Sequence, residues 1–232
     1  MNDHLHPLDD PIRSSLSGRH GHLAEWRGRV ARYVPDVAPF LTLPARPEPA
    51  DWADAAEFTG PGGTVPLVGS DTTPPDGWAI VARFEGVQMT GEDVEGRPEP
   101  EAVVLTEADV PEMLALVELT QPGPFLPRTI AMGTYLGIRR EGRLVAMAGE
   151  RLRPPGWTEI SAVCTDPGLR GQGLAGRLVR AVAAGITERG DRPFLHAVAT
   201  NANAISLYET LGFRLRRTMS FELAQVPGTV PA

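Results

Sequence analysis

A glycine-bearing loop between an apolar strand and a long helix constrains this chain more than any other feature. The run "TEISAVCT" (158–165) is rich in β-branched and apolar residues and is typical of a buried strand. After the loop, apolar residues recur every four positions from Leu174 to Ile186, which predicts a helix that ends at Gly190. A second strand, "PFLHAVAT" (193–200), follows. A strand, a helix and a strand in this order indicate a parallel pair with a right-handed connection, and hence an α/β fold.

The same loop spells G-x-G-x-x-G across Gly171, Gly173 and Gly176, a pattern shared with dinucleotide-binding loops. Such a site needs its first glycine directly after the strand and an acidic residue at the end of the next strand. Here "DPGLR" separates the strand from Gly171, and Asp191 comes before the next strand. Too little chain follows for the rest of a nucleotide domain, so we reject a nicotinamide or flavin site.

The loop nevertheless meets the physical requirements of a phosphate site. Small residues let the backbone approach an anion, and the first amides of the helix beginning near Leu174 have no partner within the helix. Arg170 adds a positive charge beside them. We therefore expect this loop to bind phosphate.

Two motifs in the second half point to one family. The loop fits the form [QR]-x-x-G-x-[GA] through Arg170, Gly173 and Ala175, and "NANAISLYETLGF" (201–213) places an asparagine before a helix with a tyrosine and a Leu-Gly-Phe end. Together they resemble the pyrophosphate loop and the second cofactor motif of the GNAT superfamily of acyl-CoA-dependent N-acyltransferases. The resemblance covers residues 101–224. It implies acetyl-CoA or another acyl-CoA as co-substrate, and a central mixed sheet that splays apart at the cofactor site.

The resemblance also implies which residues hold the cofactor. Backbone groups of Val163 and Thr165 would pair with the pantetheine arm, and the amide near Val163 would donate to the thioester oxygen. Asn203 would contact the cofactor, cap its helix, or do both. The residues expected to bind acyl-CoA are Val163, Thr165, Arg170, Gly171, Gln172, Gly173, Leu174, Ala175 and Asn203.

Tyr208 is the residue expected to assist the leaving group. It would donate a hydrogen bond to the departing thiolate, and the alternative is a tyrosine that packs with Leu207 and Leu211. Full proton transfer is less favourable, because a phenol with a pKa of about 10 is a weaker acid than a thiol at about 8.5.

A base must also remove a proton from the ammonium group of the acceptor. Glu159 is the first candidate, because it lies on the strand beside the expected thioester and burying a carboxylate there is costly. An exposed or salt-bridged carboxylate is the alternative. Glu150 and His196 are further candidates, interpreted otherwise as a charge at a strand end and an ordinary strand histidine.

The first hundred residues differ from the rest in composition and in the length of their periodic segments. They are proline-rich, and the acidic stretch Gly91–Glu101 has the composition of a linker, so we expect an N-terminal domain over 1–100 and the GNAT-like domain over 101–232. One interpretation makes the first domain a degenerate half of the same fold, although no motif supports it. Apolar spacing from Leu23 to Tyr33 predicts a helix, and "TVPLVG" and "WAIVARF" predict strands.

The remaining elements of the second half follow from local patterns. "AVVL" predicts a strand, and the spacing from Val110 to Val117 predicts a helix capped by Thr106 or Asp109. "YLGIRR" and "RLVAMAGERLR" form a predicted hairpin, a short helix covers "NAISLYETLG", and "FRLRRTMSFEL" is a last strand.

Composition and net charge argue against some classes of binding partner. A net charge of -7 argues against nucleic acid, and no stretch approaches the roughly 18 apolar residues of a membrane span, so we expect a cytoplasmic protein. Cys164 is the only cysteine and is expected to be a small buried hydrophobe. The pairs His4–His6 and His20–His22 would need a third ligand to hold a metal, and we interpret them as loose polar residues.

Acyl transfer is therefore the leading hypothesis. It would move an acetyl or other acyl group from acyl-CoA to a primary amine by direct attack, the acceptor being a small molecule, a peptide or a protein. The alternative is a catalytically inactive acyl-CoA sensor or interaction module.

Overall fold

The computed structural model describes residues 6–68 and 72–228 and shows a mixed α/β fold, as predicted. Its main sheet has eight strands in the order β4-β11-β5-β10-β9-β8-β7-β6, and a smaller antiparallel sheet has the order β1-β2-β3. The strands are β1 (Ala24–Arg27), β2 (Val30–Tyr33), β3 (Leu41–Thr42), β4 (Thr64–Val68), β5 (Ala79–Thr90), β6 (Ala102–Val104), β7 (Tyr135–Arg140), β8 (Arg143–Glu150), β9 (Trp157–Thr165), β10 (Arg192–Val198) and β11 (Arg214–Gln225).

Five α-helices and four short 3-10 helices occur among these residues. They are α1 (Pro11–Leu16), α2 (Pro49–Thr59), α3 (Val110–Thr120), α4 (Leu174–Glu188), α5 (Ala202–Leu211), η1 (Gly21–Leu23), η2 (Glu107–Asp109), η3 (Thr129–Met132) and η4 (Pro167–Leu169). None of the helices in the described segments is long and apolar enough to cross a membrane.

Every element predicted for the second half is present. The strands β6 to β11 and the helices α3, α4 and α5 follow the predicted order, and β9 and β10 pair in parallel. Thr106 and Asp109 form a capping box at the entrance to α3, where the Asp109 carboxylate accepts hydrogen bonds from the backbone and side chain of Thr106.

The helix predicted from Leu23 to Tyr33 is wrong. The segment forms the antiparallel hairpin β1-β2, in which Arg27 pairs with Val30. Gly28 has a φ of +50° in the two-residue turn, a conformation that ends a helix and that hairpin turns favour. Apolar spacing shared by two short strands was therefore mistaken for one helical face.

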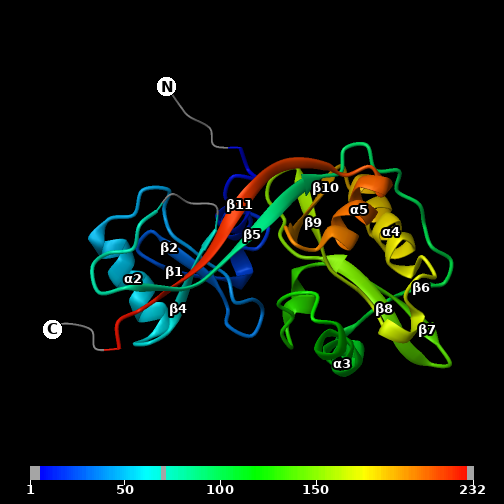
Figure 1. The fold of residues 1–232 in the computed structure, drawn as a ribbon, viewed down its shortest axis with the longest axis horizontal. Coiled ribbons are helices and arrows are strands. Elements are labelled where there is room, and N and C mark those ends of the chain that lie inside the picture. Colours follow the sequence, from blue (N-terminus) through cyan, green and yellow to red (C-terminus); the bar gives the residue numbers. More distant parts are fainter. Residues whose placement is uncertain (1–5, 69–71, 229–232) are drawn as a thin grey trace.

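The main sheet runs across the division expected near residue 101. Strand β4 pairs with β11, and β5 lies between β10 and β11, although β4 and β5 both belong to the first hundred residues. In Figure 1, β5 and β11 run side by side along the length of the molecule and join its two lobes. The stretch Gly91–Glu101 packs on α4, since the Arg97 amide donates to the Arg180 carbonyl. The two-domain division stays a prediction, and it does not coincide with an edge of the sheet.

The two faces of the main sheet carry different layers. Helix α4 packs on one face, where its apolar residues meet Ala146 and Ala148 of β8. Helix α3 packs on the other face, against Met147. Residues of the N-terminal part form a third cluster with Trp157 and Phe194, next to the strands β9 and β10. The first hundred residues thus cover part of the central sheet.

Candidate active site

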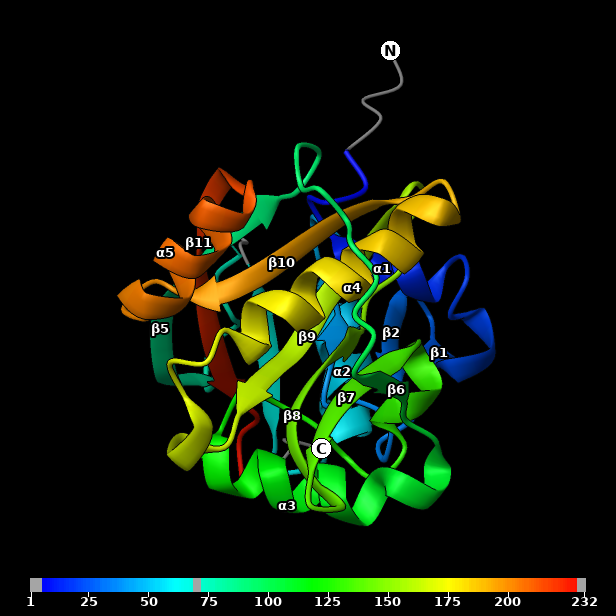
Figure 2. The ribbon, with the colours of Figure 1, turned by 90° about the vertical axis from the view of Figure 1, so that its right-hand side faces the viewer.

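Strands β9 and β10 separate toward their carboxyl ends. Their parallel pairing runs from Trp157 opposite Arg192 to Glu159 opposite Phe194, and no later pair follows. Beyond that point β9 stays paired with β8 and β10 stays paired with β5. Figure 2 shows the two strands moving apart toward their arrowheads. The splay that the resemblance implied is therefore present, in the place where open sheets bind ligands.

The backbone of β9 turns hydrogen-bonding groups into this gap. The Asp166 amide donates to the Val145 carbonyl of β8 at 2.8 Å, and the groups of successive residues in a strand point to opposite sides. Val163 and Thr165 therefore face away from β8, toward the gap. A bulge at Ala162, whose φ is +53°, lies just before these two residues and shifts by one position which backbone groups point to which side of β9. The Thr165 hydroxyl oxygen is buried and has no hydrogen-bond partner among the described residues.

The glycine loop continues from β9 and ends at the first turn of α4. Gly171 has a φ of +80°, and Gly173 is the N-cap of the helix with a φ of +74°. A Cβ added at either glycine would meet no atom within 4 Å, so the space above the loop is open. The unpaired amides of the first helical turn point into such a space. The loop therefore offers a backbone cradle of the shape and polarity that a phosphate requires.

Asp166 braces the start of this loop. Its carboxylate accepts a hydrogen bond from the Gly168 amide at 2.9 Å and from Arg143 at 2.6 Å. The guanidinium of Arg143 holds the pKa of Asp166 below its usual value. Arg170 and Gln172 are exposed at the tip, Ala175 is half-buried, and Leu174 is buried in the core. Leu174 can therefore offer a ligand only its backbone.

Helix α5 brings Tyr208 to the same region. The side chain is 8% exposed and packs edge-on against Phe213, with ring centroids 5.8 Å apart. Burial raises the pKa of Tyr208 to about 12, with a further contribution from Cys164 of β9. The phenol is thus a stable hydrogen-bond donor and a poor proton donor. The structure shows the packing on Phe213, and the hydrogen bond to a leaving group stays a prediction.

Asn203 lies exposed in the first turn of α5 and does not cap the helix. The N-cap is Asn201, whose side chain accepts a hydrogen bond from the Ala204 amide at 3.2 Å. The capping role considered for Asn203 is therefore wrong, because the helix begins two residues earlier than that role requires. Asn203 remains free to contact a cofactor.

Glu159 is fully buried, and its carboxylate is saturated with hydrogen bonds. Arg151 donates from Nε and Nη2, each at 2.8 Å, and the Leu152 amide donates at 3.3 Å. Nδ1 of His196 lies 2.7 Å from the same carboxylate. Although burial alone would raise it, Arg151 and His196 hold the pKa of Glu159 well below its usual range. Glu159 can therefore act on a bound molecule only through the groups that it contacts.

The two other base candidates differ in position. Glu150 is buried, is bound by Arg189 at 2.5 Å and is not among the residues that line the cavity described next. His196 follows the last β9-β10 pair by two residues and lines that cavity. Its Nε2 lies 2.9 Å from the side-chain nitrogen of Gln88. The pair Glu159–His196 thus reaches the cavity through the imidazole.

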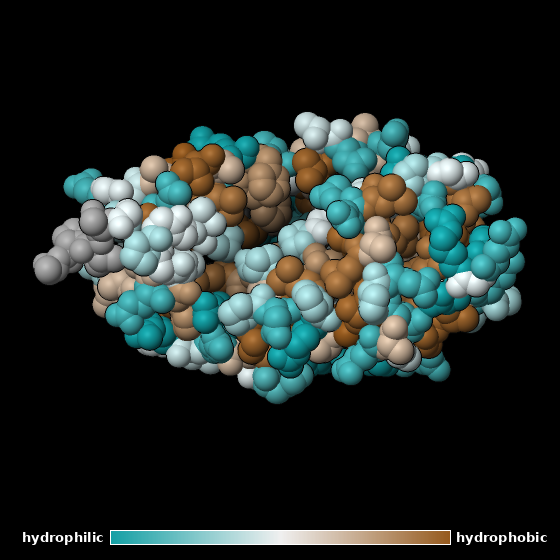
Figure 3. Space-filling model, turned by 90° about the horizontal axis from the view of Figure 1, so that it is seen from below, coloured by the Kyte–Doolittle hydropathy of each residue, from teal (hydrophilic) through white to brown (hydrophobic). Residues whose placement is uncertain are grey.

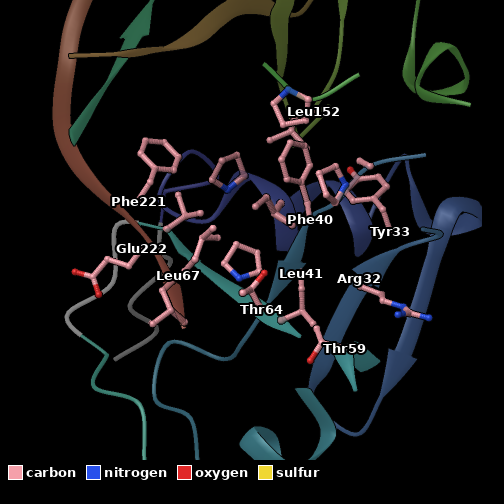
Figure 4. A pocket seen from close by; sticks show the side chains of 18 of the residues that line it. Arg32, Tyr33, Phe40, Leu41, Thr59, Thr64, Leu67, Leu152, Phe221 and Glu222 are labelled. Atoms are coloured by element: carbon pink, nitrogen blue, oxygen red, sulfur yellow. The ribbon is translucent and has the colours of Figure 1, made fainter. Parts of the chain in front are cut away.

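A cavity of about 660 Å³ opens on the side of the sheet covered by the first hundred residues. Figure 3 shows a hollow between the two lobes with hydrophobic residues gathered around it. In Figure 4, Phe40, Leu41, Leu67 and Phe221 point toward a common space. His196, Arg151 and Leu152 line it from the main sheet. The cavity therefore meets the β9-β10 gap at His196.

Sequence reasoning missed this cavity and Arg151. The cavity walls come from short segments without a motif, and Arg151 meets Glu159 only because β8 and β9 pair. The histidines of the N-terminal part were also partly misinterpreted: His20 is buried and bonded to the Tyr33 hydroxyl at 2.8 Å, so it is not loose. His4 lies outside the described residues. No cluster of three metal-ligating side chains occurs in 6–68 or 72–228, and Cys164 is buried as expected.

Known proteins are similar to this chain in fold and in sequence. The sequence-family model of FR47-like proteins matches residues 135–221. A crystal structure from Novosphingobium aromaticivorans, assigned to the GNAT family of acetyltransferases, is 41% identical, with a TM-score of 0.87 over 97% of this chain and 100% of that one. A GCN5-related N-acetyltransferase from Kribbella flavida has the same fold, with 20% identity and a TM-score of 0.58 over 94% and 96% of the two chains.

No curated protein is detectably similar to this sequence. The match to the Novosphingobium protein nevertheless spans nearly the whole of both chains, including the first hundred residues that the sequence motifs did not cover. On this ground the chain belongs to the GNAT family of acetyltransferases.

Proposed function

We propose that this protein transfers an acetyl group from acetyl-CoA to a primary amine by direct attack in a ternary complex. One observation carries the proposal: the gap between β9 and β10 opens between a glycine cradle at the start of α4 and a cavity that ends at His196. A donor and an acceptor that enter from these two sides would meet at the gap.

The chain offers contacts to two parts of acetyl-CoA. The glycine loop and the first amides of α4 suit its pyrophosphate, with Arg170 beside them. The free backbone edge at Val163 and Thr165 suits the amides of its pantetheine arm. When bound, acetyl-CoA supplies a thioester whose carbonyl carbon is open to attack by an amine.

Tyr208 stabilises the leaving side of the reaction. Its neutral phenol, kept protonated by burial, donates a hydrogen bond toward the sulfur position. This bond strengthens as negative charge develops on sulfur, so it favours the transition state over the ground state.

His196 and Glu159 act on the acceptor side. His196 borders the cavity and takes at Nε2 the proton that the ammonium group must lose, a step in which the amine displaces the Gln88 amide from that nitrogen, while Glu159 fixes the orientation of the ring through Nδ1. Glu159, the first candidate for the base, thus acts through His196 and becomes a positioning residue in this proposal. Its buried ion pair with Arg151 keeps the carboxylate charged for this task.

The direct test mixes the full chain with acetyl-CoA and a panel of primary amines. We expect release of the free thiol in step with formation of the amide, measured by thiol titration and mass spectrometry. Binding of acetyl-CoA without thiol release from any amine would favour the sensor alternative, and absence of binding by calorimetry would refute both. The full chain is needed because β5 completes the sheet.

The proposed base pair has its own test. Glu159→Gln and His196→Ala should lower kcat/KM at neutral pH, and the deficit should narrow toward pH 10. An ammonium group with a pKa near 10 is only about one part in a thousand neutral at pH 7, so a lost base matters most there. Glu150→Gln is the matched control and should keep the parent profile, since Glu150 does not line the cavity. Parallel pH profiles for all four proteins, with folding checked at each pH, would rule out the pair as the base.

A further inference from the structure

We propose, building on the function proposed above, that the acceptor amine carries a large, neutral, apolar substituent, and that the 660 Å³ cavity holds this substituent while the nitrogen lies at His196. This cavity, called here the acceptor cavity, is lined by residues from both halves of the chain. Its position, its walls and its charge balance each support the inference.

The position of the acceptor cavity fits an acceptor site. Leu152 and His196 lie at the end where β9 and β10 separate, and Thr59 and Thr64 lie at the opposite end in Figure 4. A molecule with its nitrogen at His196 would therefore extend away from the gap, into the N-terminal part. The cavity volume is within the range of sites that hold a small organic ligand.

The walls of the acceptor cavity are mainly hydrophobic. Phe84 of β5 stacks on Phe221 of β11, with ring centroids 5.1 Å apart and planes at 5°. Phe40 lies under the Arg151 guanidinium at 5.0 Å from its ring centroid. The main apolar side chains of the wall are Phe40, Leu41, Phe58, Leu67, Phe84 and Phe221.

Each arginine and each carboxylate of the wall already has a partner in the protein. Arg32 binds Glu25 at 2.7 Å and donates to the Phe58 carbonyl at 2.6 Å. Glu222 pairs with Arg83 at 2.8 Å.

Arg151 is held by the buried Glu159 in the same way. The wall therefore offers no uncompensated charge to a second charged group on the substrate. A substituent that is both neutral and apolar is the one that such a site accepts without loss of hydration energy.

Substrate selectivity follows in measurable terms. Each methylene that moves from water into the acceptor cavity should raise kcat/KM about fourfold, until the cavity is full. A second ammonium group at the far end of the chain would have to give up its hydration without gaining a counter-charge, so a diamine should be used at least about tenfold less well than the monoamine of equal length.

The experiment uses the full chain with acetyl-CoA and three monoamines, 1-aminobutane, 1-aminohexane and 1-aminooctane. The diamine 1,6-diaminohexane is the charge control for 1-aminohexane. Binding of 1-octanol, which has the apolar chain without the reacting nitrogen, is measured by calorimetry without acetyl-CoA. We expect a rising series, weak use of the diamine and detectable binding of 1-octanol.

A pair of variants ties these readouts to the cavity. Phe84→Ala removes part of its wall and should flatten the chain-length series and weaken 1-octanol binding at least about fivefold. Val81→Ala is the matched control, because Val81 is a similarly exposed apolar residue of β5 that does not line the cavity. It should behave like the parent.

The outcomes separate this inference from the proposed function. Turnover that is independent of chain length, or equal use of the diamine, overturns the inference and leaves amine acetylation intact. Binding of 1-octanol that responds to Phe84→Ala, without turnover of any amine, supports the apolar cavity and overturns the transfer. Absence of both turnover and 1-octanol binding overturns the two together.

Discussion

Replacing Arg151 by methionine tests the buried network that supports the proposed base. Methionine replaces the unbranched apolar stem of arginine and lacks the guanidinium, so the fully buried Glu159 carboxylate loses both hydrogen bonds from that group. Removing one partner of a buried ion pair typically costs about 3–5 kcal/mol. Glu159 would keep His196 and the Leu152 amide, so we expect the lower end, about 3 kcal/mol at pH 7. For a chain of this length that is a fall in Tm of about 6–12 °C.

The destabilisation caused by Arg151→Met should depend on pH in a defined direction. In the parent, the pKa of Glu159 is lowered, so its contribution is present above the unfolded value of about 4.3 and is lost as the pH falls below it. Without Arg151, burial dominates and raises that pKa, so the folded variant takes up a proton that the unfolded chain does not. The destabilisation of Arg151→Met should therefore shrink between pH 7 and pH 5.

Urea unfolding of the parent and Arg151→Met at both pH values measures this effect. The double variant Arg151→Met/Glu159→Gln is the control, since the neutral amide still accepts the His196 hydrogen bond and should recover most of the loss. A cost below about 1 kcal/mol for the single variant, or a cost that grows toward pH 5, would refute the reasoning, because the pair would then behave like one at the surface.

Three further predictions concern the cofactor site and the N-terminal core. Gly173→Glu should abolish acetyl-CoA binding by calorimetry, whereas Gly190→Glu at the other end of α4, with a similar φ of +80° and open space, should not; equal loss would point to backbone strain. Tyr208→Phe should lower kcat about 10- to 100-fold and change acetyl-CoA affinity much less, and equal losses would leave Tyr208 with packing alone. Burial lowers the pKa of His20 to about 4, so the free energy of unfolding should fall by about 3 kcal/mol as the pH drops from 6.5 to 4. Urea unfolding of His20→Gln should lack this fall, and the same fall in the variant as in the parent would contradict the prediction.

The second half of the chain was predictable because its signals are local. The apolar period of α4, the capping box before α3 and the hairpin between β7 and β8 each depend on residues close in sequence. The glycine loop was found for the same reason, since its chemistry lies in adjacent residues. Its place at the splayed strands then followed from the order of the elements.

The rest depends on contacts between distant segments. Nothing in the local sequence of β5 tells that it enters the sheet between β10 and β11. Phe40, Phe84 and Phe221 come from three separate segments and share a cavity only in the folded chain. The partner of Glu159 is likewise set by the pairing of β8 with β9, so the sequence could suggest a buried carboxylate and not the cation that neutralises it.

The place of β5 in the sheet also has a consequence for biosynthesis. Both of its neighbours, β10 and β11, leave the ribosome after it, and β11 is complete only at Gln225. At typical elongation rates this delay is on the order of ten seconds, during which β5 has no sheet partner and its backbone N–H and C=O groups stay unpaired. Such unpaired edges invite pairing between nascent chains.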